Sequence, residues 1–273
     1  MARFTNISIN RMENFIHNGD IMSMKAIVMY SENNEAAVLE YNELISSGEI
    51  TIVDKQEDAE IILAIGGDGT LIRTIGSFTK SCNVPFGLIG KGTVNYLAMG
   101  ENPKLTKIHR LRGILPSPNY KPYLLHNVDH LMPCINEFAI TNTRQLTGET
   151  PAMLTLDMYI DDELVYSNFR GDGLIIATSI GSTGYAMSAG GPIVDIGAPV
   201  TVIVPSNEYS RRSRPLIVSN DRVIRVLAKS DVLITIDGNQ CSRLAKNHEI
   251  VISKHDEIKL WHGNTLIREE KIR

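Results

Sequence analysis

A strand that ends in two glycines is the feature that most restricts how this chain of 273 residues can fold. Residues 61–65 are all apolar, and Gly66-Gly67-Asp68-Gly69-Thr70 follows them directly. Residues 71–78 then read as a helix. This order of strand, glycine-rich turn and helix is typical of a parallel sheet layered by helices, whose ligands gather at the carboxyl ends of the strands.

The residues on either side of this turn predict more strands and helices in alternation. Three apolar runs predict strands and one segment predicts a helix, at residues 26–30, 51–53, 84–89 and 32–45. We therefore expect an α/β domain with a parallel sheet over residues 25–118. An N-terminal extension, residues 1–24, precedes it.

The composition changes at a proline-rich stretch, residues 115–122, where no helix can continue. Short segments rich in β-forming residues follow, at residues 123–128, 137–143, 152–160, 173–179, 201–205, 223–228, 232–237 and 258–261. Asp161-Asp162 and Asp237-Gly238 predict hairpin turns between such segments. We expect a mostly β second domain over residues 119–273, and leave open whether its C-terminal segment returns to the first domain.

Charge and cysteine content exclude several classes of partner. The 27 Lys and Arg residues against 31 Asp and Glu residues give a formal charge of −4, so no basic excess predicts a nucleic-acid partner. Cys82, Cys134 and Cys241 are widely spaced and odd in number, which fits neither a disulfide framework nor a zinc site and favours a cytoplasmic protein. Neither the apolar core of a signal peptide nor the roughly 20 apolar residues of a membrane span occurs, so we expect no membrane partner.

The glycine turn has the chemistry of a phosphate site. Such a turn, opening into a helix, presents backbone N–H groups and the positive end of the helix dipole, so Gly66, Gly67, Gly69 and Thr70 are predicted to bind phosphate. The carboxylate of Asp68 would be repelled there unless it binds a metal ion, orients a hydroxyl or takes a proton from one. The alternative is a tight turn in which Asp68 caps the helix.

Two later blocks carry polar side chains that suit a ligand, and the first also contains several glycines. In the first, Asp172 lies between two glycines, and a loop with hydroxyls at Ser179, Ser182 and Thr183 leads to Tyr185. Here backbone can approach a ligand, Tyr185 can stack on an adenine, and Asp172 can accept hydrogen bonds from an amide or a sugar. The second is Asn136-Glu137, whose amide and carboxylate together can read a vicinal diol. The alternatives are a surface turn with a capped helix for the first block and a turn with a solvated carboxylate for the second.

These blocks resemble motifs of one enzyme family. The glycine turn resembles that of the superfamily containing NAD kinases, diacylglycerol and sphingosine kinases and phosphofructokinases. Residues 169–193 resemble the long signature of the NAD kinases, and residues 134–140 resemble their Asn-Glu element. The resemblance covers about residues 25–240 and implies an α/β nucleotide-binding domain followed by a β-rich NAD-binding domain.

The resemblance also implies an activity and a role for each matching residue. ATP would phosphorylate the 2′-hydroxyl of the adenosine ribose of NAD to give NADP, with Asp68 as the general base. Asn136 and Glu137 would hold the ribose, Asp172 the nicotinamide side, and Arg170 the substrate or another subunit. The adenine end would contact Thr183, Gly184, Tyr185 and Ser188. Mg²⁺ or another divalent cation would accompany ATP without a fixed protein metal site or a tightly bound cofactor, and the chain would form a homodimer or homotetramer.

The sequence departs from the family pattern at residues 87–98, which resemble the Gly-Thr-x-Asn-x-x-Ala element of the lipid kinases. There Gly92, Thr93 and Asn95 predict a turn beside a phosphate, with Lys91 neutralising charge. Ser179-Ile180 and Gly184 also stand where NAD kinases usually have Pro-Thr and Ala. Two alternative functions follow: a kinase of this fold acting on another nucleoside, sugar or lipid, and a catalytically silent NAD(P)-binding sensor.

Overall fold

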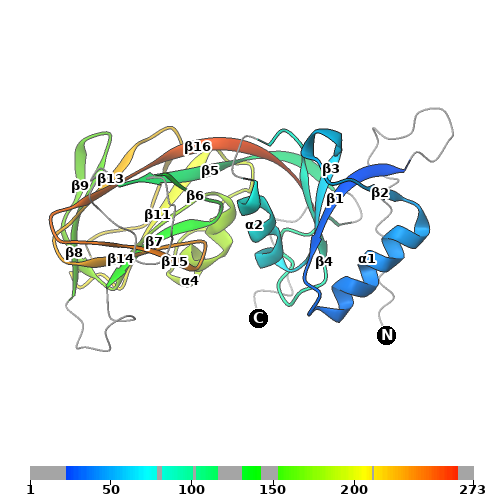
Figure 1. Ribbon diagram of the computed structural model, residues 1–273. Coiled ribbons are helices and arrows are strands. Elements are labelled where there is room, and N and C mark those ends of the chain that lie inside the picture. Colours follow the sequence, from blue (N-terminus) through cyan, green and yellow to red (C-terminus); the bar gives the residue numbers. More distant parts are fainter. Residues whose placement is uncertain are drawn as a thin grey trace. The chain divides into compact units, whose positions relative to one another are not determined.

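The computed structural model describes residues 23–78, 82–100, 103–115, 131–142, 153–210 and 212–263. The chain divides into two compact units: unit 1 comprises Met1–Lys107 and Ile258–Arg273, and unit 2 comprises Ile108–Glu257 (Figure 1). Most of the N-terminal extension, most of the proline-rich stretch and the strand predicted at residues 123–128 lie outside the described residues. In the part of the chain that is described, no helix is long and apolar enough to cross a membrane.

Unit 1 is an α/β domain with a parallel sheet, which confirms the predicted fold class. Its elements are β1 (Met24–Tyr30), α1 (Glu35–Ser47), β2 (Ile50–Ile52), the short 3₁₀ helix η2 (Gln56–Asp58), β3 (Ile61–Gly66), α2 (Asp68–Ser77) and β4 (Phe86–Gly90). The strands lie in the order β2-β1-β3-β4, all parallel. The C-terminal end of β16 (Glu249–His262) adds a further parallel strand next to β4, with Leu260 opposite Phe86.

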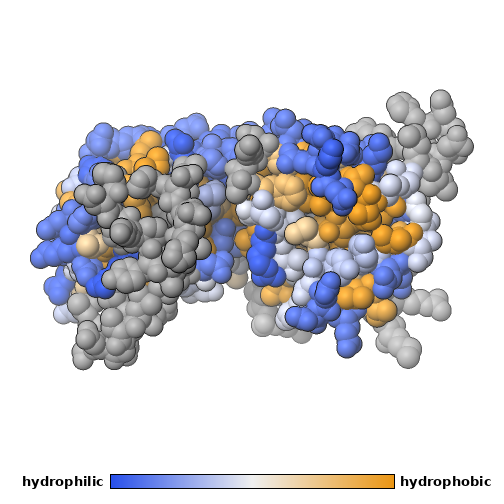
Figure 2. All heavy atoms as spheres, in the orientation of Figure 1, coloured by the Kyte–Doolittle hydropathy of each residue, from blue (hydrophilic) through white to orange (hydrophobic). Residues whose placement is uncertain are grey.

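The core of unit 1 explains why β3 is a continuous apolar run. Every residue of β3 is buried, as expected for a central parallel strand covered on both faces. Helix α1 begins where the Asn34 side chain accepts a hydrogen bond from Ala37 N, and ends at Gly48, which adopts the left-handed conformation. On strands β1 and β2, Met29 and Ile52 are 40% and 37% exposed, and Figure 2 shows hydrophobic residues at the surface of unit 1. The fully buried core therefore centres on β3.

Two glycines of unit 1 give a test of backbone conformation alone, because a Cβ on Gly76 or on Gly48 would meet nothing within 4 Å. Gly76 lies in α2, so Gly76→Ala is expected to stabilise the chain by about 0.5 kcal/mol through helix propensity. Gly48 has φ 71°, so Gly48→Ala is expected to destabilise it by about 1 kcal/mol. Urea denaturation followed by circular dichroism measures both changes, and equal effects of the same sign would contradict this assignment.

Unit 2 is mostly β, again as predicted. Two long strands, β5 (Lys104–Ile114) and β16, have residues in both units. The other elements are β6 (Leu131–Cys134), β7 (Glu137–Asn142), β8 (Leu154–Ile160), β9 (Glu163–Gly171), β10 (Gly173–Ala177), the 3₁₀ helix η3 (Ile180–Thr183), α4 (Tyr185–Ser188), β11 (Val200–Ser206), β12 (Leu216–Ser219), β13 (Ile224–Ala228), β14 (Val232–Ile236) and β15 (Asn239–Leu244).

These strands form two antiparallel layers around one core. One layer has the order β12-β11-β10-β7-β14-β15, and the other contains β16, β13, β8 and β9. Side chains from both layers, such as Phe138, Ile176 and Val226, share one buried cluster. The predicted hairpin turn between β8 and β9 is confirmed, because Asp161 and Asp162 both have positive φ and connect paired residues.

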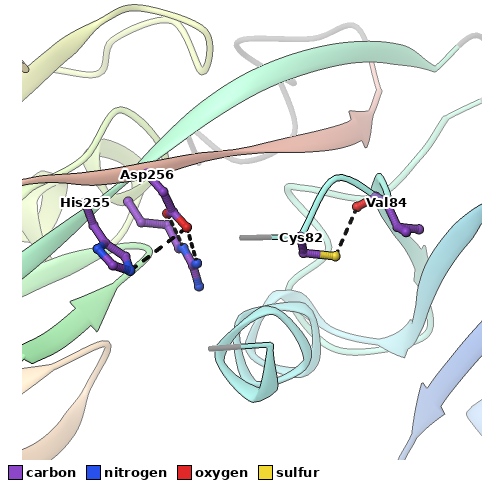
Figure 3. A network of polar contacts seen from close by, with 5 residues as sticks. Cys82, Val84, His255 and Asp256 are labelled. Atoms are coloured by element: carbon purple, nitrogen blue, oxygen red, sulfur yellow. Dashed lines mark hydrogen bonds and ion pairs between the residues drawn. The ribbon is translucent and has the colours of Figure 1, made fainter. Parts of the chain in front are cut away.

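An ion pair between β5 and β16 carries a charge into the interior of unit 2. Arg110 is only 1% exposed, and its guanidinium donates to both carboxylate oxygens of Asp256, at 2.7 and 2.5 Å. Burial alone would raise the pKa of Asp256, but the hydrogen bonds and charge of Arg110 lower it. His255 lies beside the same carboxylate, as Figure 3 shows. The buried arginine is therefore compensated by its paired, hydrogen-bonded carboxylate.

Candidate functional site

The glycine turn connects β3 to α2 as predicted, and its backbone packs against the turn after β4. A Cβ on Gly67 would lie 2.9 Å from the carbonyl oxygen of Val94. A Cβ on Gly92 would lie 2.5 Å from the Cα of Gly67. Both distances are too short for a side chain, so the close approach of two backbone segments requires glycine at both positions.

Asp68 does not cap its own helix, contrary to the simpler interpretation. Gly67 is the cap residue, and Asp68 is the first residue of α2. The Asp68 carboxylate instead accepts hydrogen bonds from the backbone N–H groups of Tyr96 and Leu97, each at 2.9 Å. Each carboxylate oxygen can accept more than one hydrogen bond, so both can still accept from a ligand. The half-buried carboxylate is thus oriented from outside its helix.

Residues 90–98 form the predicted turn, but Lys91 has a different partner from the one expected. The Asn95 side chain accepts from Gly92 N at 3.1 Å and donates to Gly92 O at 2.7 Å, which closes the turn. The Lys91 ammonium lies 2.6 Å from the Glu40 carboxylate of α1. Lys91 therefore forms an ion pair within the protein. The same segment supplies the Tyr96 and Leu97 amides that hold the Asp68 carboxylate.

Arg73 is a further candidate that the sequence did not single out, and it lies one helical turn after the glycine turn. The Arg73 guanidinium lies 3.4 Å from the Thr70 hydroxyl, and its side chain is exposed. An arginine in the first turns of a helix adds a full positive charge to the partial charge of the helix N-terminus. Its spacing of three residues from Thr70 could have indicated that both side chains lie on the same face of the helix.

In unit 2, three segments meet at one end of the central strands of the six-stranded sheet. Strand β7 lies between β10 and β14, with Glu137 opposite Ala177 and Phe138 opposite Ile236. Because these pairs are antiparallel, the start of β7 lies beside the ends of β10 and β14. These strand ends therefore bring together Asn136-Glu137, the loop at residues 178–185 and the turn Asp237-Gly238.

The hydroxyls of this loop bind the protein itself. The Ser179 hydroxyl donates to Ala198 O at 2.5 Å, that of Ser182 to Ser179 O at 2.6 Å, and that of Thr183 to Ile180 O at 3.1 Å. The side chain of Ile180 is 5% exposed, so it belongs to the core. The hydroxyls fix the shape of the loop, and Thr183 keeps only its acceptor capacity for a ligand.

The loop presses directly against Asn136. A Cβ on Gly181 would lie 2.1 Å from the carbonyl oxygen of Asn136 and 2.6 Å from its carbonyl carbon. Thr178 N also donates to Asn136 O at 2.8 Å. Only glycine therefore fits at position 181. The hydrogen bond from Thr178 and the close contact at Gly181 fix the loop against the Asn136 backbone.

Asn136 and Glu137 present two buried acceptors without a protein partner. Within the described chain, the side-chain oxygen Oδ1 of Asn136 and Oε2 of Glu137 have no hydrogen-bond partner, although Glu137 is only 6% exposed. A Cβ on Gly184 would lie 3.5 Å from Glu137 Oε2 and 3.8 Å from Asn136 Nδ2, so both side chains face the space beside this glycine. Buried acceptors are normally satisfied. This pair therefore suits a ligand that donates hydrogen bonds from neighbouring hydroxyls.

The electrostatics of Glu137 are unusual for a carboxylate. Burial, and secondarily the charge of Asp237, raise its pKa to about 7, while a hydrogen bond from the Tyr185 backbone lowers it. Beside it, the side chains of Tyr185 and Ser188 are exposed, Tyr185 by 44%. An exposed aromatic ring next to these polar side chains is available to stack on a base.

Arg170 and Asp172 lie at the other end of β10. Gly173 opens this strand opposite Ser206 and Thr141, whereas Ala177 closes it opposite Glu137. From residue 172 to residue 178 the strand advances about 20 Å. Asp172 accepts from the Asn207 side-chain amide at 2.9 Å, and Arg170 lies over the Tyr209 ring at 5.8 Å. Within one chain these two residues are thus not brought to Asn136 and Glu137.

Comparison with known proteins finds two family models along the chain. The ATP-NAD kinase C-terminal domain matches residues 140–262, and the diacylglycerol kinase catalytic domain matches residues 30–110. The second match includes residues 87–98, where the sequence resembles the lipid kinases.

Individual relatives match most of the chain. The NAD kinase of Clostridium perfringens (strain 13 / Type A) is 30% identical over 235 residues, which cover 81% of this chain and 83% of that protein. The NAD kinase of Methanothermobacter thermautotrophicus is 37% identical over 204 residues, covering 73% and 70%.

Two solved structures share the fold. Yeast NADH kinase complexed with NADH superposes with a TM-score of 0.73 at 20% identity, covering 92% of this chain and 85% of that chain. An NAD kinase from Archaeoglobus fulgidus in complex with ATP has a TM-score of 0.67 at 24% identity, covering 87% and 93%.

Proposed function

This chain belongs to the NAD kinase family, and we propose from this that it transfers a phosphoryl group from ATP to the 2′-hydroxyl of the adenosine ribose of NAD, giving NADP. The observation that carries the proposal is the buried pair of free acceptors, Asn136 Oδ1 and Glu137 Oε2. A ribose supplies two neighbouring hydroxyls of the kind that this pair can accept from. Tyr185, exposed beside Glu137, would contact the adenine together with Thr183, Gly184 and Ser188.

The proposed chemistry assigns Asp68 the proton of the attacking hydroxyl. Its carboxylate is held by two backbone amides and retains acceptor capacity, as a general base requires. The glycine turn, Thr70 and the nearby cation of Arg73 would hold the donor phosphates. Phosphoryl transfer needs little else from a protein than positioning and charge stabilisation.

A divalent cation, which we propose to be Mg²⁺, would neutralise charge on the ATP phosphates. Among the described residues no group of three His, Cys, Asp or Glu side chains is arranged to hold a metal, and in this proposal the cation binds with the nucleotide. We further propose a cytoplasmic homodimer or homotetramer. In the proposed mechanism Asp172 contacts the nicotinamide side of NAD, and Arg170 contacts the substrate or another subunit.

A transfer assay with radiolabelled ATP tests the function directly. Purified protein with a divalent cation is offered NAD, NADH, free nucleosides, sugars and diacylglycerol, and labelled products are separated. Label in NADP is the expected result. Label only in another acceptor would favour a different kinase of the same fold, which the match of residues 30–110 to the diacylglycerol kinase model motivates. Calorimetric binding of NAD without any labelled product would favour a silent sensor.

The raised pKa of Glu137 predicts how substrate affinity depends on pH. The ionised carboxylate is the stronger acceptor for a ribose hydroxyl, and Glu137 becomes ionised as pH rises through about 7. The KM for NAD is therefore expected to fall by about 10-fold between pH 6 and pH 8, as the ionised fraction grows. In Glu137→Gln this dependence should disappear. A wild-type KM that is constant over this range would remove ionised Glu137 from ribose binding.

A further inference from the structure

The turn Asp237-Gly238 is the predicted two-residue hairpin between β14 and β15. Asp237 has φ 49° and Gly238 has φ 76°, and the flanking residues Ile236 and Asn239 are paired. A turn with two left-handed residues accepts Asn-Gly as readily as Asp-Gly. The turn alone therefore gives no reason for a carboxylate at position 237.

The carboxylate of Asp237 has a separate set of partners across the sheet. It accepts from the backbone N–H groups of Ile135, at 3.0 Å to Oδ2, Asn136, at 2.7 Å to Oδ1, and Glu137, at 3.3 Å to Oδ1. In return, Asp237 N donates to Glu137 O at 3.1 Å. Three consecutive amides that donate to one carboxylate fix the backbone of residues 135–137, where strand β7 begins.

We infer that Asp237 is a positioning residue, which holds Asn136-Glu137 in the conformation that binds the ribose of NAD. This inference rests on the proposed function. Asp237 touches no free acceptor of the pair; it acts through the backbone from which both side chains extend. The loop around Gly181 fixes the opposite side of Asn136, so the dipeptide is clamped between two segments.

The same carboxylate also acts on Glu137 through its charge. After burial, the charge of Asp237 is the next cause that raises the pKa of Glu137. The other titratable group of a described element that faces Glu137 is the thiol of Cys134 on β6, which burial keeps neutral by raising its pKa. Tyr185 contributes its backbone N–H. Asp237 is thus the charged neighbour through which substitution can change both the position and the ionisation of Glu137.

Asp237→Asn tests both effects, because asparagine keeps the turn and removes the charge. NAD binding is measured by calorimetry at intervals from pH 6 to pH 8. We expect the dissociation constant of the variant at pH 8 to rise about 10-fold, since hydrogen bonds from the three amides to a charged acceptor are weakened. We also expect its pH midpoint to move below the wild-type value, so that affinity varies less across this range. A purely structural role for Asp237 would change the affinity without moving the midpoint.

A matched control is Asp231→Asn. At the opposite end of the same hairpin, Asp231 accepts from Lys246 N at 2.9 Å and pairs with Arg243, so the substitution also removes a charged cap from this hairpin. It should leave NAD affinity and its midpoint at wild-type values. Asp237→Glu keeps the charge and lengthens the side chain; it should weaken binding while the midpoint stays near 7, and it serves if Asp237→Asn does not fold.

The outcomes distinguish this inference from the proposed function. A wild-type chain that neither binds nor phosphorylates NAD would overturn both. A wild-type chain that phosphorylates NAD, beside an Asp237→Asn variant with unchanged affinity and midpoint, would overturn the positioning role alone. Unchanged affinity in folded Asp237→Glu would overturn it in the same way.

Discussion

Asp68→Asn is expected to lower kcat for NADP formation by about 10²- to 10⁴-fold, the usual contribution of a general base. Asparagine has the same size but cannot take a proton. Its amide oxygen can still accept from Tyr96 N or Leu97 N, so the local structure should persist with the loss of about one hydrogen bond. Steady-state assays of NADP formation give kcat. Calorimetry should find NAD binding within about 3-fold of wild type, since in the proposed mechanism Asp68 acts on the reacting hydroxyl while Asn136 and Glu137 hold the ribose.

Asp58→Asn is the matched control for this variant. Asp58 is an exposed acid of unit 1, in η2, and its substitution should leave turnover unchanged. Near-normal turnover in Asp68→Asn would remove the proton-transfer role from this residue. Loss of NAD binding together with turnover would instead show that Asp68 supports the structure through its contacts with Tyr96 and Leu97.

Features with a local cause could be predicted from the sequence. The run Ile61–Gly66 is apolar because it lies at the centre of a parallel sheet, and the glycines after it are required by backbone contact. The turns Asp161-Asp162 and Asp237-Gly238 are short polar pairs between β-forming segments, which directly predict hairpins. In each case the residues that give the signal are those that make the structure.

Partners distant in the sequence could not be predicted. Strand β5 is rich in basic residues and has no clean alternation, since the buried Arg110 is satisfied by Asp256, 146 residues later. Asp68 binds backbone amides 28 and 29 residues away, and Asp237 binds amides about a hundred residues away. Backbone donors are present at almost every residue, so they leave no pattern in the sequence.

The hydroxyls of the loop at residues 178–185 show a related limit. Small hydroxyl side chains next to glycines are equally suited to a ligand and to the carbonyls of their own loop. The sequence predicted a ligand site at this loop. In the structure the Ser179 hydroxyl donates to Ala198 O and the Ser182 hydroxyl donates to Ser179 O. Ser182 is fully buried, and burial depends on how the loop packs against the rest of unit 2.

Gly181→Ala is the variant for which we expect the largest loss of NAD binding. The added Cβ would lie 2.1 Å from the carbonyl oxygen of Asn136, and no side-chain rotation can relieve a contact with backbone. The loop must move away from β7 and take with it the Thr178 contacts that hold Ile135 and Asn136. We expect a cost of about 1–3 kcal/mol in stability, and a rise of about 10- to 100-fold in the dissociation constant for NAD. Thermal denaturation and calorimetry measure the two effects.

Gly184→Ala, three residues later in the same loop, is the control for folding. There the Cβ would lie 3.4 Å from the carbonyl oxygen of Gly181, which is an ordinary contact. Its melting temperature should therefore stay within about 2 °C of wild type, because no clash is created. If Gly181→Ala melts with wild-type stability and binds NAD normally, the loop can move without displacing Asn136. The loop would then not be what holds Asn136 and Glu137 in position. If both variants lose stability equally, the loop tolerates no added methyl group, and the contact at Gly181 has no special part in holding Asn136.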